Sequence, residues 1–286
     1  MKRVLICVSV ILISTGCSIK RMAVNSMVPT FGDLTGAAYK QVDTEILRHG
    51  MPFTIILIDG LLELSPNNRD LLVIAAQAYG GYPTAFIDED EDPERAKRLY
   101  VKGRDYGLRA LKLNKKFRKT LEEGKRFREA VQYLDEKYIP AMFWTAQNWA
   151  AWLSLSTKNV SALFDQPKII ALMERVMELD DTYYYGGVHL FYALYYANMP
   201  PMAGGGMDKA QAEFDKVFEF AGENFLMANF FYAQYYAAPL RDEALFDREL
   251  KKVLETPSDV EPELTFMNEV AKLKAKKLLN KKNRIF

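Results

Sequence analysis

The spacing of apolar residues constrains the fold of this chain more than any other feature. From Gly36 to the C-terminus, apolar side chains recur every three or four positions, which places them on one face of an α-helix. Residues that begin and end helices separate these stretches, as at Asp92-Pro93-Glu94, where an N-cap, a first-turn proline and an acidic residue follow in order. The run Ile55–Ile58 has the composition of a buried strand, but helical spacing continues to Leu64, so we interpret it as helix. The pattern predicts an all-α fold of about a dozen helices.

Several predicted helix ends resemble one another and have the order of apolar and polar residues found where a tetratricopeptide repeat ends. They are Leu61–Pro66, Ala110–Lys115, Val176–Asp181 and Val217–Gly222. Small residues such as Ala75 and Ala228 follow where paired helices of such repeats approach closely. The intervals between these ends depart from a constant repeat of about 34 residues. We therefore expect a degenerate tetratricopeptide-repeat-like superhelix with insertions, and a generic amphipathic bundle is the alternative for any single match.

The N-terminal segment resembles a bacterial lipoprotein signal. Lys2 and Arg3 precede an apolar run over 4–13 that is too short to span a bilayer, and small residues at 14–16 precede Cys17. In such signals the cysteine thiol receives a diacylglycerol and the preceding peptide is removed. The alternative is an ordinary secretory signal in which the cysteine stands by chance.

This interpretation divides the chain into a signal peptide (1–16), a lipidated N-terminus and linker (17–35) and a helical-repeat domain (36–286). Acyl chains on Cys17 anchor a protein stably when more than one is attached. No later apolar run is long enough to cross a bilayer, so we expect this lipid to be the only membrane anchor. We expect the protein to face the periplasm, and Ser18 in place of Asp favours the outer membrane over the inner one.

Composition argues against several classes of activity. The chain has 38 basic and 37 acidic residues, so its charge provides no attraction to nucleic acid. Its two histidines, His49 and His189, form no His-Glu-x-x-His pattern, and Cys17 is the one cysteine left after removal of residues 1–16. We therefore expect no cofactor, no metal and no catalytic residue. An enzyme built on a hidden carboxylate pair is the remaining alternative.

Two loops have partial matches to ligand-binding patterns. Gly204-Gly205-Gly206 lacks the Gly-Lys-Ser/Thr ending of a phosphate-binding loop, so we expect a flexible turn. Asp88, Asp90 and Asp92 alternate as at the start of a calcium loop, but the later glycine and glutamate of that loop are missing. We expect a solvated acidic loop that ends in an N-cap.

Aromatic density is the most unusual internal feature. Buried tyrosine hydroxyls need hydrogen-bonding partners, so dense rows of tyrosine often border a cavity or a partner surface. We expect most of these side chains to fill the core and a subset to line a ligand tunnel or partner surface. The candidates are Trp144, Asn148, Trp149 and Trp152 in one cluster, and Tyr184, Tyr185, Tyr192, Tyr195, Tyr196, Phe231, Tyr232 and Tyr235 in another.

Several segments keep a distinctive order along the chain. They are Met51-Pro52, Leu61–Asn68, Ala75–Tyr79, Arg95–Tyr100, Gly103–Tyr106, Leu172–Arg175, Pro200-Pro201 with Gly204-Gly205, Tyr232–Tyr236 and Ala244–Phe246. In this order they resemble the T-component (TatT) family associated with tripartite ATP-independent periplasmic (TRAP) transporters, over nearly all of the chain after residue 17.

The resemblance implies a periplasm-facing lipoprotein of tetratricopeptide-like helices that assembles as a homotrimer. It further implies a tunnel in each protomer, a small organic-acid or hydrophobic ligand, and a periplasmic substrate-binding protein as partner. We expect a non-enzymatic accessory protein of a transport system. The alternative from another class is a helical-repeat scaffold for envelope protein assembly, which would use only the outer surface of the repeats.

Overall fold

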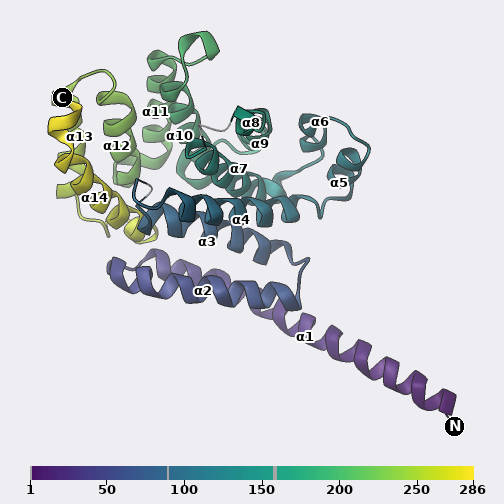
Figure 1. Ribbon diagram of the computed structural model, residues 1–286. Helices are drawn as coiled ribbons and strands as arrows, with labels where there is room; N and C mark the ends of the chain where they lie inside the picture. Colours follow the sequence, from purple (N-terminus) through teal and green to yellow (C-terminus); the bar gives the residue numbers. More distant parts are fainter. Residues whose placement is uncertain (1, 89, 157–159) are drawn as a thin grey trace. The chain divides into compact units, whose positions relative to one another are not determined.

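The computed structural model describes residues 2–88, 90–156 and 160–286. Within these ranges the chain forms helices and turns without a β-strand, so the all-α prediction is confirmed and Ile55–Ile58 lies in a helix (Figure 1). The tetratricopeptide-like superhelix stays a prediction. The helices are α1 (Lys2–Tyr39), α2 (Thr44–Leu64), α3 (Arg69–Phe86), α4 (Pro93–Leu111), α5 (Lys115–Glu122), α6 (Phe127–Val131), α7 (Ile139–Ser154), α8 (Val160–Leu163), α9 (Gln166–Leu179), α10 (Tyr183–Asn198), α11 (Met207–Ala221), α12 (Leu226–Tyr232), α13 (Glu243–Glu255), α14 (Thr265–Asn280) and α15 (Lys282–Ile285).

The chain divides into two compact units. The first unit comprises residues 1–35 and 48–169, and the second comprises residues 36–47 and 170–286. The boundaries fall inside α1, α2 and α9 rather than in loops. The segment 17–35, which we predicted to be the lipidated N-terminus and linker, belongs to α1. The predicted processing boundaries remain predictions.

Helices α3, α4 and α7 form the centre of the first unit, with α3 and α4 side by side (Figure 1). Leu71 and Leu72 of α3 and Tyr100 of α4 are buried. The start of α4 follows the predicted capping sequence, because Asp92 accepts a hydrogen bond from the Arg95 backbone N–H at 3.2 Å. Pro93 occupies the first turn, where its missing N–H costs nothing. The local sequence thus determines where α4 begins, and the buried side chains of α4 pack against α3.

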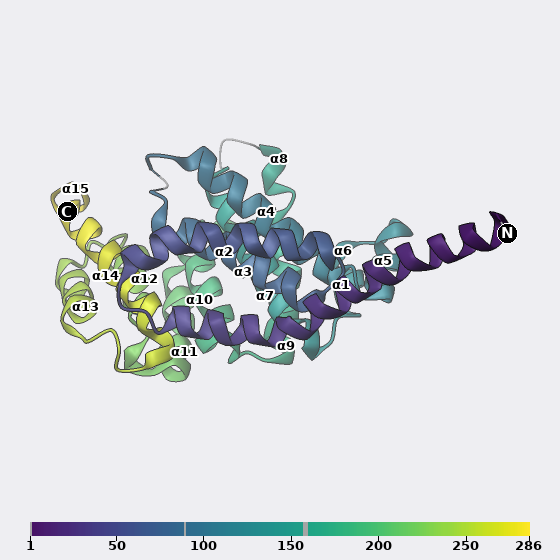
Figure 2. The ribbon, with the colours of Figure 1, turned by 90° about the horizontal axis from the view of Figure 1, so that it is seen from below.

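Asn25 of α1 holds this helix to the turn between α2 and α3. Its side-chain oxygen accepts hydrogen bonds from Ser65 Oγ at 2.7 Å and from Asn68 Nδ2 at 2.8 Å. Nearby, Val24 and Phe31 of α1 are buried. Helices α1 and α2 lie side by side in Figure 2. Val24 and Phe31, buried residues of α1, therefore pack within the first unit.

The second unit is built on α10 packed against α11, and on α12, α13 and α14 packed together (Figure 1). Asn268 of α14 is fully buried and joins three chain segments. Its Oδ1 accepts a hydrogen bond from the Leu226 N–H at 3.0 Å, and its Nδ2 donates to the carbonyls of Asn224 and Ser258. The first turn of α12 is thereby capped by a side chain from a distant helix.

The two loops that resemble ligand-binding patterns are stabilised by their own backbone bonds. Gly206 N–H donates to the Tyr196 carbonyl at 3.0 Å, and a Cβ at Gly205 would lie 1.8 Å from the Met199 carbonyl oxygen. Only glycine fits that approach. In the acidic loop, Asp92 N–H donates to the Asp88 carbonyl at 2.8 Å. Both segments are turns that connect helices.

Candidate functional site

The first cluster of candidate residues lies on α7 in the first unit. Asn148 is 1% exposed, and its Nδ2 donates to the Ala76 carbonyl of α3 at 2.9 Å and to the Trp144 carbonyl at 2.7 Å. Its Oδ1 is buried and accepts no hydrogen bond. A Cβ at Gly80 of α3 or Gly103 of α4 would lie 2.7 or 2.4 Å from this oxygen. Asn148 thus fills the space that two glycines leave between three helices.

The three tryptophans of α7 have different environments. Trp149 is 4% exposed, and its indole N–H donates to Asp165 Oδ2 at 3.1 Å. The Arg104 guanidinium lies over the rings of both Trp149 and Trp152, at 5.4 and 5.7 Å from the centroids. Trp144 and Trp152 are half-buried. Trp149 and Asn148 therefore have structural contacts that explain their burial, while Trp144 and Trp152 keep part of their surface.

The remaining candidates lie on α10, on α12 and in the π-helical segment Ala233–Ala237, all in the second unit. The predicted set is therefore distributed over both units. On α10, Tyr192 is buried while Tyr195 and Tyr196 are half-buried. Tyr196 packs on Tyr195 and Tyr192 with ring centroids 5.5 and 5.9 Å apart. The Lys209 ammonium of α11 lies 5.5 Å from the Tyr196 centroid. Burial raises the pKa of Tyr196, and Glu213 adds to the rise.

Among the candidate residues of α12 and the π-helical segment, Tyr232 is the most deeply buried. Its ring lies 4.9 Å from Phe214 and 4.8 Å from Tyr236, and its hydroxyl donates to Gln211. Burial raises the pKa of Tyr232 to about 12. Phe231 and Tyr235 are half-buried and pack together at 5.9 Å. Tyr235 belongs to the π-helical segment, a backbone form often found at functional sites.

Tyr184 and Tyr185 stand in a left-handed turn at the beginning of α10. Their φ values are +51° and +60°, and Gly186 follows at +70°. A non-glycine residue in this region costs about 1–2 kcal/mol, so two consecutive tyrosines represent stored strain. Burial raises the pKa of the Tyr184 phenol well above its ordinary value, and a hydrogen bond with Tyr39 adds to the rise. The Tyr185 ring packs on Phe225 at 5.6 Å.

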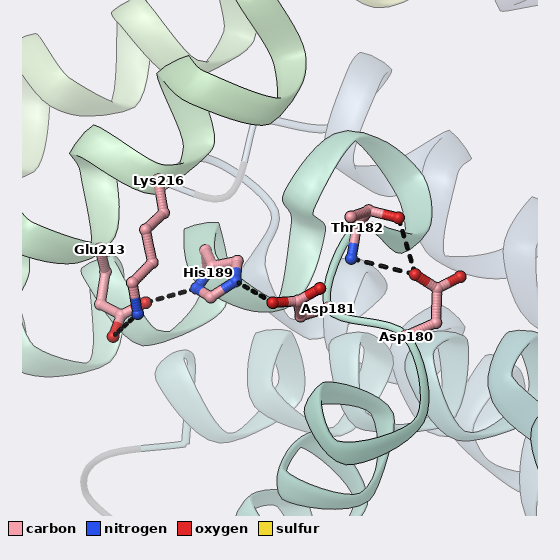
Figure 3. Close-up of polar contacts among 6 residues, drawn as sticks. All are labelled: Asp180, Asp181, Thr182, His189, Glu213 and Lys216. Atoms are coloured by element: carbon pink, nitrogen blue, oxygen red, sulfur yellow. Dashed lines mark hydrogen bonds and ion pairs between the residues drawn. The ribbon is translucent and has the colours of Figure 1, made fainter.

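His189 lies one helical turn beyond this left-handed segment and is 2% exposed (Figure 3). Its Nδ1 bonds Glu213 Oε2 of α11 at 2.6 Å, and Lys216 lies 3.5 Å from the other oxygen of that carboxylate. The second ring nitrogen, Nε2, makes no hydrogen bond and lies 3.7 Å from Asp181 Oδ2. Because an ionised carboxylate only accepts, Nδ1 carries the proton shared with Glu213.

The Glu213 carboxylate is stabilised in its charged form. Burial is the largest influence and would raise the pKa of Glu213, but the hydrogen bond from His189 and the charge of Lys216 outweigh it and lower the pKa below its ordinary value. Glu213 is a functional candidate that no sequence pattern indicates. No linear motif joins it to His189, which lies 24 positions away. The glycine pair Gly186-Gly187 is the one local signal that a regular helix does not begin at Tyr183.

In the first unit, a cluster of hydrogen-bond donors surrounds the carboxylate of Asp59 on α2. Its two oxygens accept hydrogen bonds at 2.7 Å from Tyr79, Tyr106 and Lys102. Burial would raise the pKa of Asp59, but the three donors outweigh it and lower the pKa. The donors come from α3 and α4, so this cluster fixes α2 on them. Over the described residues, no three side chains of His, Cys, Asp or Glu gather as metal ligands, and no helix is both long and apolar enough to cross a membrane.

Most of this chain is similar to known proteins. A family model described as the TRAP transporter T-component matches residues 40–286. An uncharacterized protein of Treponema pallidum (strain Nichols) is 24% identical over 274 residues, which cover 85% of this chain and 84% of the relative. The family match begins four residues before α2 and includes every residue of the aromatic clusters. The chain therefore belongs to the TRAP transporter T-component family.

Proposed function

We propose that this protein is a non-enzymatic accessory lipoprotein that binds a periplasmic substrate-binding protein and holds a small organic-acid or hydrophobic ligand against the aromatic residues of α10 and α12. Family membership supports the assignment to a TRAP transport system. The partly exposed aromatic rings support the ligand-binding role, since ligand sites combine apolar rings with a few polar groups.

The observation that carries the proposal is the pairing of Tyr196 with Lys209. The Tyr195 and Tyr196 rings are half-buried and keep surface on which an apolar ligand can lie. Lys209 is exposed above Tyr196 and donates to the Gly204 carbonyl at 2.9 Å, which holds its ammonium near the rings. An ammonium beside aromatic rings fits a ligand with a carboxylate at one end and a hydrocarbon body. This chemistry favours an organic acid within the proposed ligand class.

The anchoring and assembly form part of the same proposal. Lipid attached to Cys17 holds the mature protein to the envelope, at the outer membrane, with the helical domain facing the periplasm. The protein assembles as a homotrimer, in which each protomer presents its own aromatic rows. These features extend the envelope location that the family supports.

Binding of organic acids to the full chain in mild detergent tests the ligand role. Tyrosine fluorescence and calorimetry would follow titration with monocarboxylates of increasing hydrocarbon length. We expect Lys209→Gln to weaken binding about tenfold or more, because it removes the charge that faces the carboxylate. The matched control is Lys116→Gln, since Lys116 lies over Tyr133 at a similar 5.8 Å but belongs to the first unit, whereas the aromatic rows of α10 and α12 belong to the second.

Binding of the substrate-binding protein is measured separately, by light scattering or calorimetry with periplasmic substrate-binding proteins of TRAP transporters. A complex that forms with and without organic acid supports the accessory role. If the full chain binds neither the substrate-binding protein nor any of the acids, the proposal is overturned and the scaffold alternative is favoured.

A further inference from the structure

The ring nitrogen Nε2 of His189 is a buried polar atom that the proposed ligand binding does not use. It makes no hydrogen bond, although the side chain is only 2% exposed. The Asp181 carboxylate lies 3.7 Å from it, in the turn before α10 (Figure 3). Because Nδ1 already donates to Glu213, the neutral imidazole presents a lone pair to this second carboxylate. Two acceptors thus face each other with no proton between them.

A second proton on the imidazole removes this opposition. Nε2 then becomes a donor, and closure of the gap from 3.7 Å to about 2.9 Å forms a charge-assisted hydrogen bond with Asp181. Histidine is the side chain that gains or loses such a proton in the physiological range of pH. The Asp181 side chain is 49% exposed, so the proton can arrive from solvent beside the carboxylate. Acidification therefore produces an imidazolium with a carboxylate at each ring nitrogen.

The charged groups that contact this imidazole come from α11 and from the turn before α10. Glu213 bonds Nδ1 and is itself paired with Lys216, while Asp181 faces Nε2. The π-helical segment Ala233–Ala237, which also packs on α10, carries tyrosines and a glutamine but no charged side chain. Phe220 of α11 packs on the ring at 5.4 Å. The added proton thus changes the net charge of a small, enclosed group of side chains.

This group lies close to the proposed ligand surface. His189 and Tyr196 stand on one face of α10, two helical turns or roughly 10 Å apart. On α11, Glu213 lies one turn from Lys209, the proposed partner of the ligand carboxylate. Burial is the largest cause of the raised pKa of Tyr196, and the charges of Glu213 and of Glu174 on α9 add to it. The charge of Glu213 therefore reaches the ring against which the ligand is proposed to lie.

We propose that His189 makes organic-acid binding at Tyr196 and Lys209 dependent on pH. This regulation rests on the proposed ligand role and is separate from binding of the substrate-binding protein. At high pH the imidazole is neutral, and the charge of Glu213 beside the site repels an anionic ligand. At low pH the imidazolium compensates that charge, so Lys209 holds the ligand carboxylate more tightly. The protein then loads its ligand in acidic surroundings and releases it in alkaline ones.

Calorimetric titration of the full, untagged chain in mild detergent at about pH 6 and about pH 8 tests the regulation. Octanoate is the probe, because carboxylic acids are ionised at both values. We expect an affinity roughly three- to tenfold higher at the lower pH, the effect of one added charge at this distance in a partly buried site. In His189→Gln the ratio of the two affinities should fall to about one, since glutamine can still donate to Glu213 but takes up no proton.

The matched control is His49→Gln. The chain has two histidines, and His49 belongs to the first unit, so this variant should keep the pH response of the unmodified chain. Asp181→Asn is the second variant. Its amide can donate to Nε2 and thereby hold the imidazole neutral, so the pH response should become smaller. Circular dichroism checks folding, and the half-exposed position of Asp181 keeps the test open if His189→Gln does not fold.

Nitrogen NMR of the histidine side chains reports the proton directly. His49→Gln leaves one imidazole, so the signals of a histidine-labelled chain belong to His189. We expect Nε2 to change from unprotonated to protonated between about pH 8 and about pH 6, while Nδ1 keeps its proton. An Nε2 that stays in one state over this range contradicts the regulation, whatever the binding data show.

The outcomes separate the regulation from the ligand role. Octanoate binding with the same pH response in the unmodified chain and in His189→Gln overturns the regulation and leaves the ligand role in place. A pH response that disappears in His49→Gln but persists in His189→Gln also overturns it, because the titrating group then lies in the first unit. If no organic acid binds at either pH, the ligand role and its regulation are both overturned.

Discussion

The two units both bury a polar side chain where helices meet, but they do so by opposite means. In the first unit, Asn148 is neutral, and glycines on α3 and α4 make room for it between regular helices. In the second unit, His189 is bonded to an ionised carboxylate, and the backbone before it leaves the right-handed region at two tyrosines. The first arrangement depends on shape, and the second depends on charge and strain. We therefore expect them to respond differently to added volume, pH and backbone restriction.

Added volume should have its largest effect in the first unit. A Cβ at Gly107 of α4 would lie 2.0 Å from Thr145 Oγ1 and 3.1 Å from the Thr145 Cα on α7. The backbone atom cannot rotate away, so Gly107→Val should lower the free energy of unfolding by about 3 kcal/mol or more. Urea unfolding followed by circular dichroism measures this. Gly81→Ala is the control, because a Cβ there meets nothing within 4 Å, and it should be neutral or slightly stabilising.

Charge removal should have an intermediate effect in the second unit. Glu213→Gln replaces the carboxylate that accepts from His189, and we expect a loss of about 1.5–3 kcal/mol at pH 7. The folded pKa of Glu213 is lowered, so its contribution is fully present above the ordinary glutamate pKa and disappears as pH falls through the folded value. The free energy of unfolding of the unmodified chain should therefore fall more steeply below about pH 4.5 than that of Glu213→Gln. Parallel pH profiles would show that the charge contributes little.

Backbone restriction should have the smallest effect. Gly186 has φ +70°, and its Cβ would lie 3.2 Å from a ring carbon of Phe220. We expect Gly186→Ala to cost about 1–2 kcal/mol, since alanine must adopt the left-handed conformation. The thermal midpoint should decrease, while Gly81→Ala in the first unit should not lower it. An unchanged midpoint for Gly186→Ala would mean that the turn relaxes without cost and that little strain is stored at Tyr184 and Tyr185.

Features that depend only on neighbouring residues in the chain were predictable from the sequence. The capping sequence at Asp92 placed the start of α4, and helical spacing through Leu64 correctly excluded a strand at Ile55–Ile58. Asn148 stands out in the sequence as a polar residue among aromatic ones, but its partner on α3 and the two glycines that surround it are distant in sequence. The role of each aromatic residue was also undetermined, because Tyr232 and Tyr195 belong to the same kind of row, yet one is enclosed and the other half-buried.

The sequence by itself determined the helical class, the helix boundaries with clear caps and the resemblance to a transporter component, because periodicity and capping act over a few residues. Only the tertiary structure brought His189 to Glu213 and placed Tyr184 and Tyr185 in a left-handed turn. These features depend on contacts between residues far apart in the chain, which stabilise a strained backbone or an ionised group that no local preference would choose.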